Sequence, residues 1–239
     1  MRVAVVSDIH GNRTAFEAVL ADLRVTSPDL ILQGGDLADN GSSPVEIVDR
    51  VRELGWPGVV GNTDEMLFRP ASLQEFAAAS RAPAALFAAI GEMAAATAES
   101  LGEERLAWLR GLPRAQMQVS MALVHASPES LWRAPAQTAG DADLEAAYAP
   151  LGRPLAVYGH IHYPFTRAVA GMTIANSGSV SLSYDGDPRA AYLLVDDGEP
   201  EIRRVEYDVE REIAALSVCG LPHSGWVARM LRSARPEMP

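Results

Sequence analysis

Three short apolar runs near the start of the chain each end in a cluster of polar side chains. The runs cover residues 3–6, 30–32 and 59–60, and their length and branched residues predict buried β-strands. The polar residues that follow them are Asp8 and His10, then Asp36, then Asn62 and Asp64. Because ligands collect at the carboxyl ends of strands in open α/β sheets, this repetition predicts one functional site at that edge.

The segments between these runs have the pattern of amphipathic helices. Phe16, Val19, Leu20 and Leu23 recur along one helical face, and a second helix is expected to end at Gly55. Further elements are expected in the order strand 119–124, helix 141–149, strand 155–158, hairpins 166–175 and 191–207, helix 208–218 and a C-terminal tail at about 219–239. The alternation predicts an α/β fold with antiparallel strands added in its second half.

The chain is expected to form one domain over residues 1–239, which is long enough for a single large core. An alanine-rich segment at about 66–112 predicts two or three helices that interrupt the alternation. These helices form either a surface bundle or a roof over the site. In the second case the residues facing the substrate would be Phe68, Arg69 and Trp108.

Composition and charge limit the partners that we expect. The net charge is −11, which argues against binding long nucleic acids. No apolar run approaches the roughly 20 residues that cross a bilayer, and the N-terminus lacks the layout of a signal peptide, so no membrane partner is expected. The single cysteine, Cys219, suits a reducing cytoplasm. The sequence leaves open whether the chain forms a homo-oligomer.

Four of the five histidines also follow predicted strands, which points to a metal site. Together with the polar clusters they give seven candidate metal ligands: Asp8, His10, Asp36, Asn62, His125, His160 and His162. One ion needs about four ligands, so seven suit two ions that share a bridging carboxylate. The donors are nitrogen and oxygen without a thiolate, which suits Mn²⁺, Fe or Zn²⁺ and not a closed structural zinc site.

The order of these motifs resembles that of the calcineurin-like metallophosphoesterase superfamily. The motifs are Asp8-Ile9-His10, Gly35-Asp36, Gly61-Asn62-Thr63-Asp64, His125 and Gly159-His160-Ile161-His162. The segment Asn176-Ser177-Gly178-Ser179 is similar to a turn of the small bacterial YfcE-like phosphodiesterases. The resemblance covers residues 3 to about 207 and implies a four-layer αββα fold, a double β-sandwich flanked by helices.

The resemblance also implies a role for each motif residue. The first ion would be held by Asp8, His10, Asp36 and His162, and the second by Asp36, Asn62, His125 and His160, with Asp36 bridging. Catalysis would involve Asp36, Asn62 and Asp64, and substrate binding would involve Asn62, Thr63 and His125. The ions, two divalent or trivalent metals from the set Mn, Fe, Zn and Ni, would carry a bridging hydroxide that attacks a phosphoester.

Two departures from the superfamily pattern narrow the expected substrate. Many members have a histidine where this chain has Thr63, and a hydroxyl is a poor general acid. Protein phosphatases carry an arginine soon after the aspartate that corresponds to Asp36, and none stands here. We therefore expect hydrolysis of a small-molecule phosphodiester. The alternatives are a phosphomonoesterase or nucleotide phosphatase, a nuclease, and a non-catalytic scaffold of the same fold.

Overall fold

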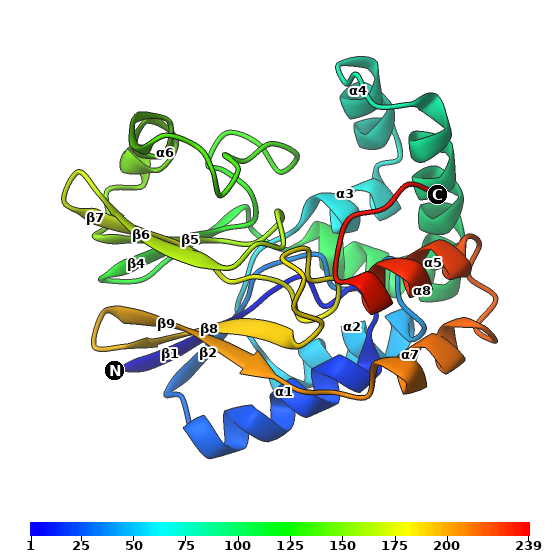
Figure 1. The fold of residues 1–239 in the computed structure, drawn as a ribbon, viewed down its shortest axis with the longest axis horizontal. Helices are drawn as coiled ribbons and strands as arrows, with labels where there is room; N and C mark the ends of the chain where they lie inside the picture. Colours follow the sequence, from blue (N-terminus) through cyan, green and yellow to red (C-terminus); the bar gives the residue numbers. More distant parts are fainter.

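In a computed structural model that describes all residues 1–239, two β-sheets stack face to face between outer helices (Figure 1). One sheet contains β1 (Arg2–Val6), β2 (Leu30–Gln33), β8 (Ala190–Asp196) and β9 (Glu199–Val205), in the order β2-β1-β8-β9. The other contains β3 (Ala115–Met117), β4 (Met121–Val124), β5 (Leu155–Tyr158), β6 (Phe165–Val169) and β7 (Met172–Asn176), in the order β3-β4-β5-β7-β6.

Each sheet buries both of its faces. In β1, Val3 and Val5 point into the apolar layer between the sheets, whereas Ala4 and Val6 join the core under the outer helices. Side chains alternate across a strand, so a run that is apolar at every position must be covered on both sides. This double burial explains why the first strand was recognisable as a continuous apolar run.

The outer layers are helical. The first sheet is covered by α1 (Arg13–Thr26) and α2 (Pro44–Leu54), and the second by α6 (Asp141–Tyr148) with the short 3₁₀ turn η1 (Ala149–Leu151) (Figure 1). The apolar stripe of α1 packs as the sequence predicted, with Phe16, Val19 and Leu23 in the core. The layers therefore follow the order helix, sheet, sheet, helix, which is the predicted αββα architecture.

The alanine-rich segment forms three helices: α3 (Asn62–Phe68), α4 (Ala71–Ala78) and α5 (Ala84–Arg110), the last interrupted at Gly102. Leu101 and Leu109 of α5 belong to the main hydrophobic core, so this helix is part of the packed body. By length and composition alone α5 could also cross a membrane. Its most apolar 18-residue stretch has a mean hydropathy of 1.2, and 28% of that stretch is buried in the structure. The expectation that no apolar run is long enough to cross a bilayer was therefore wrong for α5. Many of its apolar residues are alanines, which do not stand out in the sequence as a hydrophobic run.

Three further expectations need correction. Residues 59–60 form no strand: only Gly58 bridges Gln33, and the Val60 amide donates to the Pro113 carbonyl at 2.9 Å instead of extending a ladder. The strand expected at 119–124 exists as β4 but begins only at Met121, because residues 118–120 form the turn of a hairpin with β3, which the sequence did not predict.

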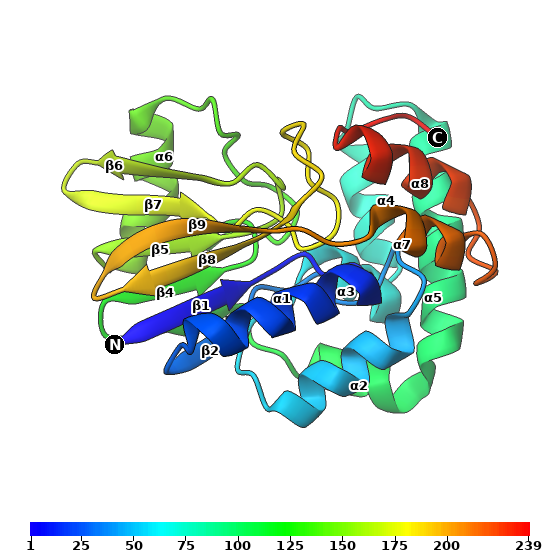
Figure 2. The ribbon, with the colours of Figure 1, turned by 60° about the horizontal axis from the view of Figure 1, so that its bottom comes forward.

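The segment at about 219–239, which was expected to be a C-terminal tail, is partly helical. After α7 (Val209–Leu216), residues of the tail form α8 (Ser224–Ser233), which buries Trp226 and Leu231. Both helices lie beside α5 at the end of the molecule opposite the β-hairpins (Figure 2).

Candidate metal centre

Six of the seven candidate ligands lie in the loops that leave four strands, and the seventh, Asn62, is the first residue of α3. The strand pairs β1–β2 and β4–β5 are each parallel, so both sheets direct strand ends toward the same region. Asp8 and His10 follow β1, Asp36 follows β2, Asn62 begins α3, His125 follows β4, and His160 and His162 follow β5. Four strand ends from two sheets therefore place their polar side chains around one point.

Five of these residues have a left-handed backbone. The φ angles are 57° at Asp8, 47° at His10, 54° at Asp36, 64° at His160 and 57° at His162. Residues other than glycine rarely adopt this conformation, and each instance costs about 1–3 kcal/mol. Such strain concentrates at functional sites, so this observation marks the loops independently of the side chains that they carry.

Glycines let the loops approach one another closely. Gly35 has φ 88°, and a Cβ atom there would lie 2.6 Å from the Gly61 amide nitrogen and 2.9 Å from His125 Nδ1. Any side chain at this position would separate the loop that carries Asp36 from its neighbours. The glycines of the sequence motifs are thus required by close backbone contact.

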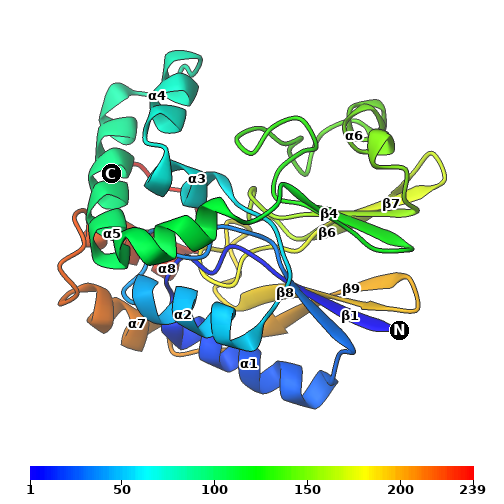
Figure 3. The same cartoon turned by 180° about the vertical axis from the view of Figure 1, so that it is seen from behind.

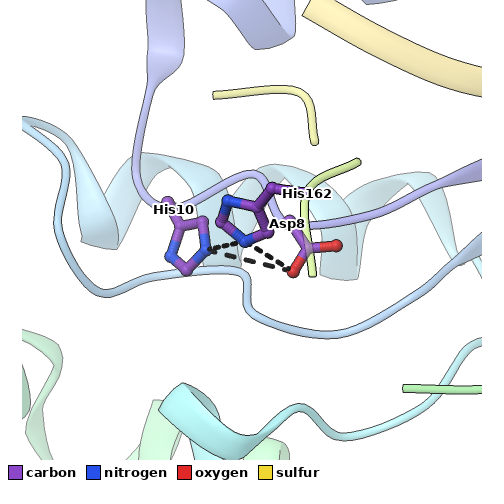
Figure 4. A group of neighbouring side chains, drawn as sticks. All are labelled: Asp8, His10 and His162. Atoms are coloured by element: carbon purple, nitrogen blue, oxygen red, sulfur yellow. Dashed lines mark hydrogen bonds and ion pairs between the residues drawn. The ribbon is translucent and has the colours of Figure 1, made fainter. Parts of the chain in front are cut away.

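A first group of donors consists of Asp8, His10 and His162 (Figure 4). His162 Nε2 lies 3.1 Å from Asp8 Oδ1 and 3.2 Å from His10 Nε2. Asp8 Oδ1 and His10 Nε2 are 4.0 Å apart, so the three donor atoms lie close enough together to be ligands of one ion. All three side chains are buried, so little water competes for these atoms.

Backbone carbonyls fix the tautomer of the histidines. His10 Nδ1 donates to Asp39 O at 3.0 Å, His162 Nδ1 to Leu182 O at 2.6 Å. With Nδ1 protonated, a neutral imidazole presents the Nε2 lone pair toward the centre. Two such lone pairs 3.2 Å apart, next to a carboxylate, repel one another, and a cation or a proton between them relieves this repulsion.

A second group of donors surrounds Asn62. Its Oδ1 atom lies 2.9 Å from His125 Nε2 and 2.8 Å from His160 Nδ1. Asp36 Oδ2 lies 3.4 Å from His125 Nε2 in this group and 3.8 Å from His10 Nε2 in the first group. A single oxygen of Asp36 therefore faces both donor groups.

Each aspartate has its other oxygen held by donors of the chain. Asp8 Oδ2 accepts from the Ser7 hydroxyl at 2.6 Å, and Asp36 Oδ1 accepts from the Thr63 amide at 2.9 Å. These bonds fix both carboxylates and leave Asp8 Oδ1 and Asp36 Oδ2 directed at the histidines. Such support from neighbouring groups is what metal ligands generally have.

Asp64 braces the loops and does not face the donor groups. Its carboxylate accepts from the amides of Asp36 at 2.8 Å, Leu37 at 2.9 Å and Gly61 at 3.0 Å. Burial and the nearby Asp36 raise the pKa of Asp64 to about 6. This geometry favours a positioning role, and the catalytic role expected for Asp64 stays a prediction.

Charge within the site is tightly coupled. Burial opposes protonation of His125, but the Asp36 carboxylate outweighs it and raises the pKa of His125 to about 10. Burial and the neighbouring His125 lower the pKa of His160 to about 4. In the absence of an ion, one imidazolium therefore neutralises Asp36, at the place where a metal cation would do the same. The donor set and its charge thus fit divalent metal ions.

Three residues that connect the surrounding loops and helices were missed in the sequence analysis. Asp39 is fully buried, and its Oδ1 atom accepts from the Thr97 hydroxyl of α5 at 2.8 Å. Glu212 of α7, 1% exposed, accepts from the hydroxyls of Thr14 at 2.7 Å and Ser42 at 2.8 Å. These partners are distant in sequence, and no local motif signals them.

The third missed residue is Trp132, in the loop that follows His125. Its Nε1 atom donates to Glu65 of α3 at 2.7 Å.

Two of the residues that were expected to face the substrate pack against arginines. The ring of Trp108 lies under Arg52 of α2, with 6.0 Å between the ring centre and the guanidinium carbon. Phe68 lies under Arg110 at 5.5 Å.

Residues 1–198 match the family model of the calcineurin-like phosphoesterase superfamily domain. The chain is 28% identical to the uncharacterized protein MJ0912 of Methanocaldococcus jannaschii, over 96% of both proteins.

Two solved structures are similar to this chain over nearly its whole length. A metallophosphoesterase from Sphaerobacter thermophilus is 29% identical with a TM-score of 0.78, covering 98% of this chain and 100% of that one. The hypothetical protein PH1004 from Pyrococcus horikoshii OT3 has the same fold, with 19% identity and a TM-score of 0.82 over 96% of this chain and 97% of that one.

Proposed function

The chain belongs to the calcineurin-like phosphoesterase superfamily and is a metal-dependent phosphoesterase, and we propose that it hydrolyses a small-molecule phosphodiester at a dinuclear centre. The proposed ligands are the six residues that follow β1, β2, β4 and β5, together with the first residue of α3: Asp8, His10, Asp36, His125, His160, His162 and Asn62. Mn, Fe, Zn and Ni all suit this donor set, and a cytoplasmic location suits the single free cysteine.

The observation that carries this proposal is the position of Asp36. Its Oδ2 atom lies within 3.8 Å of His10 and 3.4 Å of His125, which belong to different donor groups. Its other oxygen is occupied by the Thr63 amide. A carboxylate fixed in this way is suited to bridge two ions, because one oxygen atom is shared by both donor groups.

When bound, two ions would polarise the phosphoryl group and make a hydroxide nucleophile available near neutral pH. The chain's own residues orient this chemistry. The carbonyls of Asp39 and Leu182 hold His10 and His162, and the Gly34 carbonyl holds His125 Nδ1 at 2.8 Å. Asn62 supplies a neutral oxygen, which limits the negative charge facing a phosphate.

The charge around the centre supports a diester as substrate. No arginine donates to any of the seven proposed ligands. A phosphomonoester dianion has one more negative charge than a diester and would need such a partner more strongly. The absence of a histidine at Thr63 also favours esters whose leaving group departs without a proton.

The test is metal-dependent turnover of bis-(p-nitrophenyl) phosphate by stripped and reconstituted protein. Mn²⁺ or Ni²⁺ should restore activity, with about two ions bound per chain. Asp36→Asn should lower kcat/KM by more than about 100-fold, since even residues that only support a ligand contribute 10–100-fold. Asp141→Asn, at an exposed carboxylate of α6, is the matched control and should leave activity unchanged.

Other outcomes would select the alternatives. Faster turnover of p-nitrophenyl phosphate than of the diester would identify a phosphomonoesterase. Less than one bound ion per chain, with no turnover, would indicate a scaffold and overturn the proposal.

A further inference from the structure

Aromatic side chains from three separate segments meet next to α3, the helix that begins with the proposed ligand Asn62. Phe76 of α4 stacks on Trp132 of the β4–α6 loop, with ring centres 5.1 Å apart and an interplanar angle of 29°. Phe87 of α5 packs edge-on against Phe76 at 6.1 Å. The Arg133 guanidinium carbon lies 5.9 Å from the centre of the Phe76 ring. We call Phe76, Phe87 and Trp132 the aromatic cluster.

The cluster is tied to the elements that carry the second donor group. Trp132 Nε1 donates to Glu65 Oε2 at 2.7 Å, and Glu65 follows Asn62 by three residues on α3. Three residues of helix advance about 4.5 Å, so Glu65 lies nearly one turn from Asn62 on the same side of the helix. The loop that carries Trp132 begins directly after His125. Figures 1 and 3 show this loop and α4 standing on the same side of α3.

Exposure separates this cluster from the aromatic contacts of the core. Phe16 and Trp56, which pack edge-on inside the main core, are 1% and 9% exposed. The three rings of the aromatic cluster are all half-buried, and Arg133 is exposed. Partly exposed rings with a neighbouring guanidinium group form a surface on which flat ligand rings stack.

We propose that Trp132, supported by Phe76, is a specificity-determining residue that stacks on a planar aromatic ring carried by the retained ester group of the phosphodiester. This inference rests on the proposed function. The hydrogen bond to Glu65 fixes the indole orientation, so little side-chain freedom is lost when a ring stacks. Arg133 adds positive charge at the edge of the same surface, in a chain whose net charge is −11.

The test compares two diesters with one leaving group. Thymidine 5′-p-nitrophenyl phosphate and methyl p-nitrophenyl phosphate both release p-nitrophenolate, and only the first retains a planar ring. The metal-loaded wild-type protein should prefer the thymidine ester in kcat/KM. Trp132→Ala should reduce that preference about tenfold, because stacking of a base on an aromatic side chain contributes about 1–3 kcal/mol. Trp132→Phe, which keeps a flat ring, should retain most of the preference.

Trp226→Phe is the control matched to Trp132→Phe, since it alters an indole of α8 that packs in a separate hydrophobic core. It should leave the preference between the two esters unchanged. An equal loss on both esters in Trp132→Ala, or an unchanged preference, overturns the inference, because a tryptophan that only holds the loop against α4 would act on both esters alike. No metal-dependent turnover of either ester by the wild type would instead contradict the proposed function.

Discussion

Thr63 occupies the position beside the centre where many superfamily members have a histidine. Its amide donates to Asp36 Oδ1, while its hydroxyl oxygen is buried without a hydrogen-bond partner. The backbone role does not depend on the side chain. The side chain is therefore free to be exchanged without moving Asp36.

Thr63→His should add a general acid and raise kcat/KM for esters with poor leaving groups by about tenfold or more, because positioned acids contribute about 10²–10⁴-fold. Esters of p-nitrophenol should gain little. The measurement is the dependence of rate on leaving-group pKa across a series of aryl methyl phosphates. Thr63→Val is the control, and an equal change for all esters would contradict the prediction.

Asp39 is a buried carboxyl between His10 and the helix α5. Burial raises the pKa of Asp39 to about 7, although the hydroxyl of Thr97 favours the ionised form. A folded-state pKa above the ordinary value means that the folded protein binds an extra proton between about pH 4 and pH 7. The neutral form then contributes stability at low pH that is lost as the pH rises through 7.

Asp39→Asn mimics the neutral carboxyl and should remove this loss. In metal-free protein the difference in Tm, variant minus wild type, should become more positive from pH 5 to pH 8. A domain of this size gains about 2–4 °C for each kcal/mol of stability. A difference that stays constant with pH would show that Asp39 ionises normally in the folded chain.

At the scale of elements, α7 contacts two segments that lie far from it in the sequence. The buried Glu212 accepts from Thr14, in the first turn of α1, and from Ser42, in the loop before α2. The loops that precede α1 and α2 also carry His10 and Asp36, respectively. The helix thus joins the two segments that follow β1 and β2.

Glu212→Gln should destabilise the protein by about 1–3 kcal/mol, because an amide nitrogen would face one of the two hydroxyl donors inside the protein. Urea unfolding of the metal-free protein measures this loss. Glu210→Gln, on the exposed side of α7 where Glu210 pairs with Arg232, should change stability by less than about 0.5 kcal/mol. Equal effects of both variants would exclude a special role for Glu212.

The helices of residues 66–112 illustrate what a local pattern can and cannot predict. Their helical content follows from alanine-rich composition. Their connection to the rest of the fold does not follow from composition. The hydrogen bond from Thr97 to Asp39 joins residues 58 positions apart in the sequence, and Leu101 packs in the main core. Their role as a separate cap stays a prediction.

At the scale of the whole molecule, metal should be a main source of stability. Protein stripped with EDTA should melt at a lower temperature than protein with Mn²⁺ at 100 times its Kd, where binding adds about 2.7 kcal/mol. Asp36→Asn should show a much smaller rise. A melting temperature that ignores both EDTA and Mn²⁺ would argue against an ion at this site.

The family and the αββα fold were predictable from the sequence and are confirmed, because ordered motifs and apolar strands are local signals. The seven-ligand set remains a prediction whose geometry is favourable. Asp39, Glu212 and Trp132 were not predictable, because each acquires its role from a partner that only the folded chain brings near. The two-residue strand at 59–60 failed because Val60 bonds to Pro113.

The first donor group joins Asp8 to His162, which lie 154 residues apart, and His162 itself is held by the carbonyl of Leu182. The proposed binding site would therefore stay incomplete in a nascent polypeptide until this late segment has left the ribosome and both sheets have packed together. Ions bound there would be taken up only at the end of synthesis.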